Sequence, residues 1–307
     1  MRRRGVGHRA VSDAEREQYE RDGVVALRGI LDADWLELLR AGLREVFTDQ
    51  WNTGGAVRRH GCGPAGGRRR RRHPERRTGP GHGGPRSIPH GHLVVDLQRH
   101  DSPGGTRVAT RLLAGQLFGA DKVNYYDDQV LLKEPGAREY TAFHTDEPYY
   151  HLSGLQVCGM WVSPDPVGVD NSPMRYVRGS HRWGTFFQPN SFVSQMPTYE
   201  GEGLVRVPDI EGNEDAYDIV TITSDPGDVI VHHSNLIHGS KPNYGATTPR
   251  WAASFRYAGD DVRYRFHPSA PPQPHHHHDL REGDVIDCDQ FPVVWRRNVN
   301  EEVGFHA

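Results

Sequence analysis

Cysteine is scarce in this chain of 307 residues, with three in all, at Cys62, Cys158 and Cys288. The odd number and wide spacing argue against a disulfide framework, and no C-x-x-C pair suggests a zinc site. No apolar run approaches the roughly 20 residues that span a bilayer. The basic start MRRRGVGHRA has no apolar stretch behind it that would make a signal peptide. We therefore expect a soluble protein of the reducing cytoplasm, without a membrane partner.

Large apolar residues are also modest in number. Hydrophobic residues make up 35% of the chain, which is enough for the core of one large domain. The formal net charge is only −3, although charge is distributed unevenly along the chain. Histidine and glycine are abundant by contrast, with 19 and 35 residues. The histidines therefore have to be weighed motif by motif as possible metal ligands.

Residues 53–105 contain many Arg and Gly and few large apolar side chains, as in RRHGCGPAGGRRRRRHPERRTGPGHGGPR. This composition cannot bury enough surface to offset chain entropy, so it predicts disorder. One interpretation is a basic arm that binds nucleic acid through its phosphates. We do not favour it, because the run lacks aromatic side chains for base stacking and charge runs are commonly just solvated. We favour translation out of frame or a degenerate insert, because the sequence on both sides reads as an ordinary folded protein.

The first 52 residues predict a helix–strand–helix unit. Ser12 and Glu15 form a capping box ahead of a short helix, and the apolar run at 24–27 predicts a strand. Asp32 can cap a second helix, whose apolar residues recur at helical spacing. We expect residues 1–52 to pack on the core of a single catalytic domain.

Residues 106–297 are expected to form that core. An amphipathic helix ends at Gly119, and strand-like segments separated by turn signals follow it. The predicted strands are 122–133, 155–162, 174–177, 219–222, 229–233 and 251–257. Helices first and many strands later indicate an α+β chain that is mainly β, with a sandwich or barrel in its C-terminal two thirds. Residues 298–307 are expected to form a tail.

The segment FHTDEPYY places His144 and Asp146 two residues apart. On a strand, residues i and i+2 point to the same face, so both side chains can reach one metal ion. The segment DPGDVIVHHSNLIHGSKPN offers His238 as a third ligand. Two imidazoles and one carboxylate are the facial triad of non-haem Fe(II) oxygenases. An isolated H-x-D is a weak signal, but Arg250 follows His238 by twelve residues and can grip a dicarboxylate through two hydrogen bonds.

Other histidines have plainer interpretations. His232 and His233 alternate faces of a strand, so one of them faces inward, in a structural or supporting role. His151 and His181 are expected to be packing or surface residues. The tract at 275–278 lies in a proline-rich loop and is expected to be a flexible surface feature that binds metal only adventitiously.

Taken together, these segments resemble the phytanoyl-CoA dioxygenase family, a branch of the Fe(II)/2-oxoglutarate oxygenases. The matching pieces are YYDDQVLLKEPG (125–136), FHTDEPYY (143–150), VCGMWVSPDPV (157–167), MRYVRGSHRWG (174–184), PGDVIVHHSNLIHGSKPN (226–243), TPRWAASFRY (248–257) and GDVIDCDQFPVVWRR (283–297). The resemblance covers about residues 12–52 and 106–297, and residues 53–105 do not share it.

The resemblance implies a double-stranded β-helix, the cupin-type jelly roll, with flanking helices. It implies Fe(II) held by His144, Asp146 and His238, with 2-oxoglutarate and O2 as co-substrates. Arg250 carries over as the residue that binds the far carboxylate of 2-oxoglutarate, with Arg256 as its rival.

Further residues carry over with less specificity. Ser240, two residues after the distal histidine, is implied to assist that carboxylate, and Gln129 to face the co-substrate. Trp161 either lines the pocket or packs in the core. The expected substrate-lining side chains, each of which can equally be packing, are Tyr149, Tyr150, Arg178 and Trp183.

The implied reaction is the hydroxylation, or a related oxidation, of a small organic molecule with release of succinate and CO2. Halide-transferring relatives lack the carboxylate at the position of Asp146, so halogenation is not expected. Two alternatives stay open. One is a catalytically impaired cupin-like binding module, and the other is a Zn or Mn cupin enzyme that does not use O2 and has no need of Arg250 or Ser240. The sequence leaves the substrate and the oligomeric state open.

Overall fold

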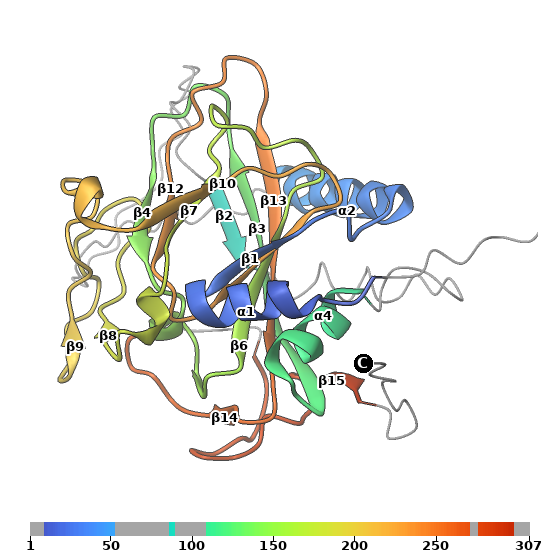
Figure 1. Ribbon diagram of the computed structural model, residues 1–307, viewed down its shortest axis with the longest axis vertical. Helices are drawn as coiled ribbons and strands as arrows, with labels where there is room; N and C mark the ends of the chain where they lie inside the picture. Colours follow the sequence, from blue (N-terminus) through green and yellow to red (C-terminus); the bar gives the residue numbers. More distant parts are fainter. Residues whose placement is uncertain (1–8, 53–85, 90–108, 271–275, 298–307) are drawn as a thin grey trace, which may run out of the picture.

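The computed structural model describes residues 9–52, 86–89, 109–270 and 276–297. Two antiparallel sheets pack face to face, and helices cover the outer face of the larger sheet (Figure 1). The helices are α1 (Asp13–Asp22), α2 (Ala33–Asn52) and α4 (Ala109–Phe118). The larger sheet runs β1 (Val24–Leu27), β11 (Val229–His233), β6 (Val157–Val162), β13 (Arg250–Ala258), β3 (Lys122–Lys133) and β15 (Val293–Arg296), with β2 (Arg86–Pro89) also pairing with β3. The smaller sheet runs β10 (Ile219–Ile222), β7 (Met174–Val177), β12 (His238–Ser240) and β4 (Thr141–His144).

Short elements join these sheets. Two small ribbons pair β5 (Leu152–Ser153) with β14 (Arg263–Tyr264) and β8 (Phe186–Phe187) with β9 (Leu204–Val205). Single 3-10 turns are η2 (Glu147–Tyr149), η3 (Ser180–Arg182) and η4 (Glu214–Ala216). The whole is the mainly β double-stranded β-helix with flanking helices, so that prediction is confirmed.

The N-terminal unit forms as its local signals predict. The side chain of Ser12 accepts a hydrogen bond from the amide of Glu15, and the Glu15 carboxylate accepts one from the amide of Ser12. Asp32 accepts a hydrogen bond from the amide of Trp35 at 2.9 Å and so caps α2. The helix ends at α1 and α4 are followed by Gly23 and Gly119, both left-handed. Strand β1 pairs with β11 at the edge of the larger sheet.

Successive side chains of β13 point alternately to the apolar core under the helices and to the space between the two sheets. Phe255 points to the helices, where its ring meets that of Trp35 edge-on at a centroid distance of 6.0 Å. Arg250 and Ala252 point the opposite way and contact or cluster with Trp161 of β6. The inner face of the larger sheet therefore carries the polar groups, while its outer face carries the main apolar core.

The predicted boundaries hold closely for most strands. Strands β3, β7, β10 and β11 have the predicted bounds, β6 begins two residues later than expected and β13 is one residue longer at each end. The expectation of disorder over 53–105 is wrong at Arg86–Pro89, which form β2. Edge pairing uses backbone hydrogen bonds and does not require apolar side chains. The rest of that segment, like residues 298–307, lies outside the described residues. Of the helices that the structure describes, none has the length and apolarity to cross a membrane.

Candidate metal centre

His144 and His238 lie directly opposite each other on paired strands β4 and β12. Their rings are buried, with centroids 4.3 Å apart. Strand β12 approaches β4 closely because Gly239 has no side chain, and an added Cβ would lie 2.6 Å from the carbonyl oxygen of Thr141. Two histidines from positions 94 residues apart in the sequence thus face one point between the sheets.

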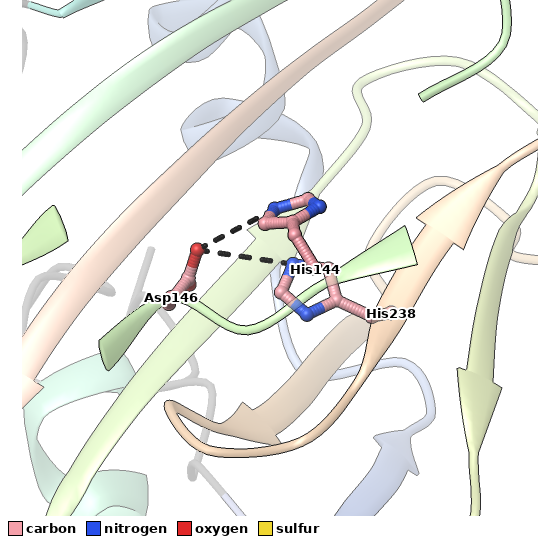
Figure 2. Close-up of side chains that lie close together, drawn as sticks. All are labelled: His144, Asp146 and His238. Carbon is pink, nitrogen blue, oxygen red and sulfur yellow. Dashed lines mark ion pairs between the residues drawn. The ribbon is translucent and has the colours of Figure 1, made fainter. Parts of the chain in front are cut away.

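Asp146 does not continue the strand of His144, so the expectation that both lie on one strand is wrong. Its backbone is helical, with φ −79° and ψ −28°, at the start of the 3-10 turn η2, where Pro148 follows. The amide of Asp146 donates a hydrogen bond to the carbonyl of Ser234 at 2.8 Å. This turn still carries the carboxylate to the histidines: Oδ1 lies 3.8 Å from Nε2 of His144 and 3.8 Å from Nε2 of His238 (Figure 2).

These three groups fit a divalent metal ion. Their ligand atoms all lie within 4.8 Å of one another, and among the described residues this is the one such cluster. Nδ1 of His144 donates to the carbonyl of Ala142 at 2.8 Å, and Nδ1 of His238 to that of Leu236 at 2.9 Å. The protons on Nδ1 leave the lone pairs of both Nε2 atoms directed at the shared point.

The ionisation states also suit a metal. Burial lowers the pKa of His144, and burial together with the neighbouring imidazoles lowers the pKa of His238 well below the usual value. Burial opposes ionisation of Asp146, but the His232 hydrogen bond and the charges of His238 and Arg256 hold its pKa well below the usual range. Neutral imidazoles and an ionised carboxylate are the forms that bind metal.

Arg250 lies beside this cluster with two nitrogen atoms that make no hydrogen bond to the described residues. Its guanidinium carbon is 5.4 Å from the centre of the Trp161 ring, and the side chain is buried. Nε and Nη1 have no hydrogen-bond partner within the described part of the chain. Burial lowers the pKa of Arg250 to about 10. A buried guanidinium with free donors is a site for an anion.

Lys133 is a second buried cation here, and it was not singled out from the sequence. It pairs directly with Arg250 across β3 and β13. Burial and the charge of Arg250 hold its pKa well below the usual value. Its ammonium donates to Oγ of Ser240 at 2.7 Å and to the carbonyl of Lys241 at 3.0 Å. The available signal was a lysine on the same strand face as Gln129, within an otherwise buried strand.

Ser240 lies beside Lys133, and its hydroxyl is engaged. It accepts from Lys133 and donates to Oγ1 of Thr141 at 3.0 Å. Arg256, the rival to Arg250, is also engaged: Nε donates to the Tyr150 hydroxyl and Nη2 to Oε1 of Gln129 at 2.6 Å. Gln129 is therefore held by Arg256 and lies four residues along β3 from the strand position that pairs with Arg250.

Two more buried donors lie between Arg250 and the metal cluster. Nε1 of Trp161 and the hydroxyl of Tyr176 have no hydrogen-bond partner among the described residues. The Tyr176 ring stacks on His238, with centroids 5.9 Å apart and planes at 29°. Unpaired donors thus extend from the guanidinium to a candidate metal ligand.

The expected substrate-lining residues divide into two groups. Tyr149 lies near the centre, since its ring is 6.1 Å from that of His144, and Tyr150 lies under Arg256. Arg178 instead pairs with Asp218 on the surface at 2.6 Å, and Trp183 is 44% exposed. The latter two are not brought to the centre.

Phe192 contacts the His144 ring on one side, and it was not singled out from the sequence. Its ring meets the His144 ring edge-on at 4.7 Å and stacks on Tyr149 at 4.7 Å. Its φ of +63° is left-handed, a strained conformation for an aromatic residue. The amide of Phe192 donates to Oδ1 of Asn190 at 2.8 Å, which holds the turn.

The remaining histidines behave as supporting residues. His233 points away from the centre and its ring lies 5.2 Å from that of His181. His232 points inward, and its Nε2 lies 3.3 Å from Oδ2 of Asp146. Within the tract at 275–278, His276 and His278 pack on Phe291, and residue 275 lies outside the described part.

The family can now be assigned, because a jelly roll carries an H-x-D…H cluster at its centre. The profile of the phytanoyl-CoA dioxygenase (PhyH) family matches residues 19–252. The chain belongs to this family. That span contains all three candidate ligands, Arg250 and every strand of the smaller sheet. No curated protein matches the chain.

Several solved structures share the fold of this PhyH-family chain. The epimerase SnoN, in complex with Fe3+, alpha ketoglutarate and nogalamycin RO, is 23% identical, with a TM-score of 0.64 over 92% of this chain and 97% of its own. The non-heme alpha ketoglutarate dependent carbocyclase SnoK from nogalamycin biosynthesis is 21% identical, with a TM-score of 0.63 over 93% and 97%. EctD from S. alaskensis, with 2-oxoglutarate and 5-hydroxyectoine, is 20% identical, with a TM-score of 0.59 over 90% and 85%.

Proposed function

We propose that this protein is an Fe(II)/2-oxoglutarate-dependent dioxygenase that hydroxylates a small organic molecule. His144, Asp146 and His238 would hold the metal. Arg250 would bind the far carboxylate of 2-oxoglutarate, assisted by Lys133 and Ser240. Related structures with the same fold contain Fe3+ with alpha ketoglutarate, or 2-oxoglutarate with 5-hydroxyectoine.

The pair of buried cations beside the triad carries this proposal. Arg250 and Lys133 face each other across two strands, and two nitrogen atoms of the guanidinium have no hydrogen-bond partner among the described residues. Two buried positive charges without a bound anion are unfavourable, because burial penalises each charge and the two repel. A small dicarboxylate that also chelates the metal would relieve this. A hydrolytic Zn or Mn centre gives no reason for such a pair.

The protein's own groups define what the site does. Nδ1–H bonds to backbone carbonyls hold both imidazoles with Nε2 turned to the metal position, and the turn at Ser234 holds Asp146. When bound, Fe(II) and 2-oxoglutarate supply the oxidation, in which O2 is consumed and succinate, CO2 and an oxidised substrate are released. Phe192 and Tyr149 shield the His144 side of the centre from water.

Hydroxylation is the outcome we propose among those that such a site supports. The fold also serves an epimerase and a carbocyclase. Asp146 occupies the third ligand position with a carboxylate, which leaves no ligand position of the triad for a halide. We place the substrate beside Arg256, Gln129 and Tyr150, because Arg256 donates hydrogen bonds to the other two and its charge favours the ionised form of Asp146.

An anaerobic titration tests the proposal. Fe(II) and then 2-oxoglutarate are added to the purified protein, and the weak visible charge-transfer band of the chelate is recorded. The histidines at 275–278 are replaced by glutamine in every protein tested, so that they do not bind metal adventitiously. We expect the band in the parent and its loss or weakening in Asp146→Ala and Arg250→Ala.

The outcomes separate the alternatives. A band in the parent would be followed by a substrate screen that measures 2-oxoglutarate-dependent succinate release. A folded parent without a band would reject the oxygenase and favour an impaired binding module. Activity that needs Zn or Mn, but neither O2 nor 2-oxoglutarate, would favour the cupin hydrolase or isomerase instead.

A further inference from the structure

His232 is a buried side chain aimed at the metal cluster that the three-ligand site leaves unexplained. It lies on β11, has 2% of its surface exposed, and its ring lies 4.5 Å from that of His238. Its Nε2 is 3.3 Å from Oδ2 of Asp146. Oδ1 is the oxygen that lies 3.8 Å from both of their Nε2 atoms.

The hydrogen-bond chemistry fixes how His232 acts. An ionised carboxylate only accepts hydrogen bonds, so the proton between the two groups belongs to Nε2 of His232. Nδ1 of the ring is buried and has no hydrogen-bond partner in the described part of the chain. Among the described residues, the hydrogen bond to Asp146 is therefore the one that orients this ring.

The sheet makes room for this ring. His232 pairs across β11 and β6 with Gly159, and Gly159 pairs on its other side with Arg256 of β13. A Cβ on Gly159 would lie 2.6 Å from Cε1 and 2.7 Å from Nε2 of His232. Any larger residue at 159 would therefore push the ring off its position. Arg256 and His232 therefore lie on either side of Gly159, and both side chains favour the ionised form of Asp146.

We infer that His232 is a positioning residue that restricts Asp146 to binding the metal through Oδ1 alone. This inference rests on the metal site proposed above. With Oδ2 engaged by Nε2–H, the carboxylate would offer a bound metal one oxygen only, which would leave room for 2-oxoglutarate and O2. Without that hydrogen bond, Oδ2 is free to turn to the metal as well and to compete with the co-substrates. Partners of this kind tune a metal site by about 10- to 100-fold.

The test uses the full chain and four variants, two at His232, one at His233 and one at Gly159, which pairs with His232. His232→Leu keeps the apolar bulk and removes the donor, while His232→Gln keeps an N–H donor. His233→Gln is the matched control, because His233 is buried on the same strand but faces His181 on the opposite side. The first readout is Co(II) binding, with its affinity and its ligand-field spectrum, whose intensity depends on coordination number. The second is the dissociation constant of 2-oxoglutarate with Fe(II) under anaerobic conditions.

We expect His232→Leu to change the Co(II) spectrum and to weaken 2-oxoglutarate binding about tenfold or more. His232→Gln and His233→Gln should stay within about threefold of the parent, with the parent's spectrum. Gly159→Ala should behave like His232→Leu, since it displaces the ring without removing it.

Two results would overturn the inference. One is a folded His232→Leu protein with the parent's spectrum and 2-oxoglutarate affinity. The other is a folded His232→Gln protein as impaired as His232→Leu, which would mean that the imidazole itself, as a metal ligand or as a packing group, is what matters. Failure of the parent to bind Co(II) or 2-oxoglutarate would instead reject the proposed function, whatever the variants do.

Discussion

Arg250 and Lys133 occupy directly paired positions on β13 and β3, and both side chains are buried. Like charges opposite each other in a sheet are unfavourable, and burial makes the repulsion stronger. A bound dianion would offset this repulsion, so the pair fits a binding site for a dianion.

Arg250→Gln should raise the dissociation constant of 2-oxoglutarate by about 100-fold or more. The change removes two charge-assisted hydrogen bonds, each with a contribution of about 1.5–3 kcal/mol. Anaerobic titration of the charge-transfer band measures it. Arg178→Gln, which breaks a surface pair with Asp218, serves as the control and should leave the constant unchanged. If Arg256→Gln abolished 2-oxoglutarate binding while Arg250→Gln did not, the assignment of the two arginines would be reversed.

Lys133→Met should separate binding from stability. We expect 2-oxoglutarate affinity to fall about tenfold, because one of the two cations that face the carboxylate is lost. The free energy of unfolding of the ligand-free protein should be unchanged or higher, since the substitution removes a buried charge that Arg250 repels. Urea unfolding and the 2-oxoglutarate titration measure the two quantities. A large loss of stability together with unchanged affinity would assign Lys133 a purely structural role through Ser240.

Asp146→Ala should reduce Fe(II) affinity at least about 100-fold and abolish 2-oxoglutarate-dependent succinate release. The carboxylate is the one anionic ligand of the cluster, and Oδ1 is equidistant from the two imidazoles. Asp121→Ala, which removes an exposed carboxylate that pairs with Arg297, is the matched control. Full hydroxylase activity in Asp146→Gly would refute the triad.

The stability of the metal-free protein should fall as pH falls below about 6.5. Burial lowers the pKa of His233 to about 4 from 6.5, so between these values the unfolded chain holds a proton that the native protein lacks. The stabilisation from this pKa difference is present in full above pH 6.5. At pH 5 its loss has lowered the free energy of unfolding by about 2 kcal/mol. The buried His144 and His238 act in the same direction, and Glu147, whose pKa burial raises to about 7, acts in the opposite one.

Comparison with His233→Gln isolates the contribution of this one histidine. Urea unfolding at pH 7.5 and pH 5 should show a loss of stability that is about 2 kcal/mol smaller in the variant than in the parent. The other titrating groups are common to both proteins and cancel in the difference. Equal losses in the two proteins would show that His233 is not protected from protonation.

Local signals were sufficient for the elements that have regular periodicity. The capping box at Ser12 and Glu15 forms as read, and the long strand β3 has its predicted ends. These features depend on residues a few positions apart, so the sequence alone specifies them. Strands β4 and β12, which carry His144 and His238, have four and three residues and are too short to show a pattern.

The residues of the candidate centre could also be predicted from the sequence, as an H-x-D…H set followed by an arginine. The sequence specifies this list of chemical groups and, through its resemblance, the jelly roll. Three relations depend on the fold instead: Asp146 leaves the strand in a turn, Lys133 joins Arg250, and His232 reaches a carboxylate 86 residues away. The physical reason is that strand pairing and register bring distant positions together, and spacing along the chain does not encode them.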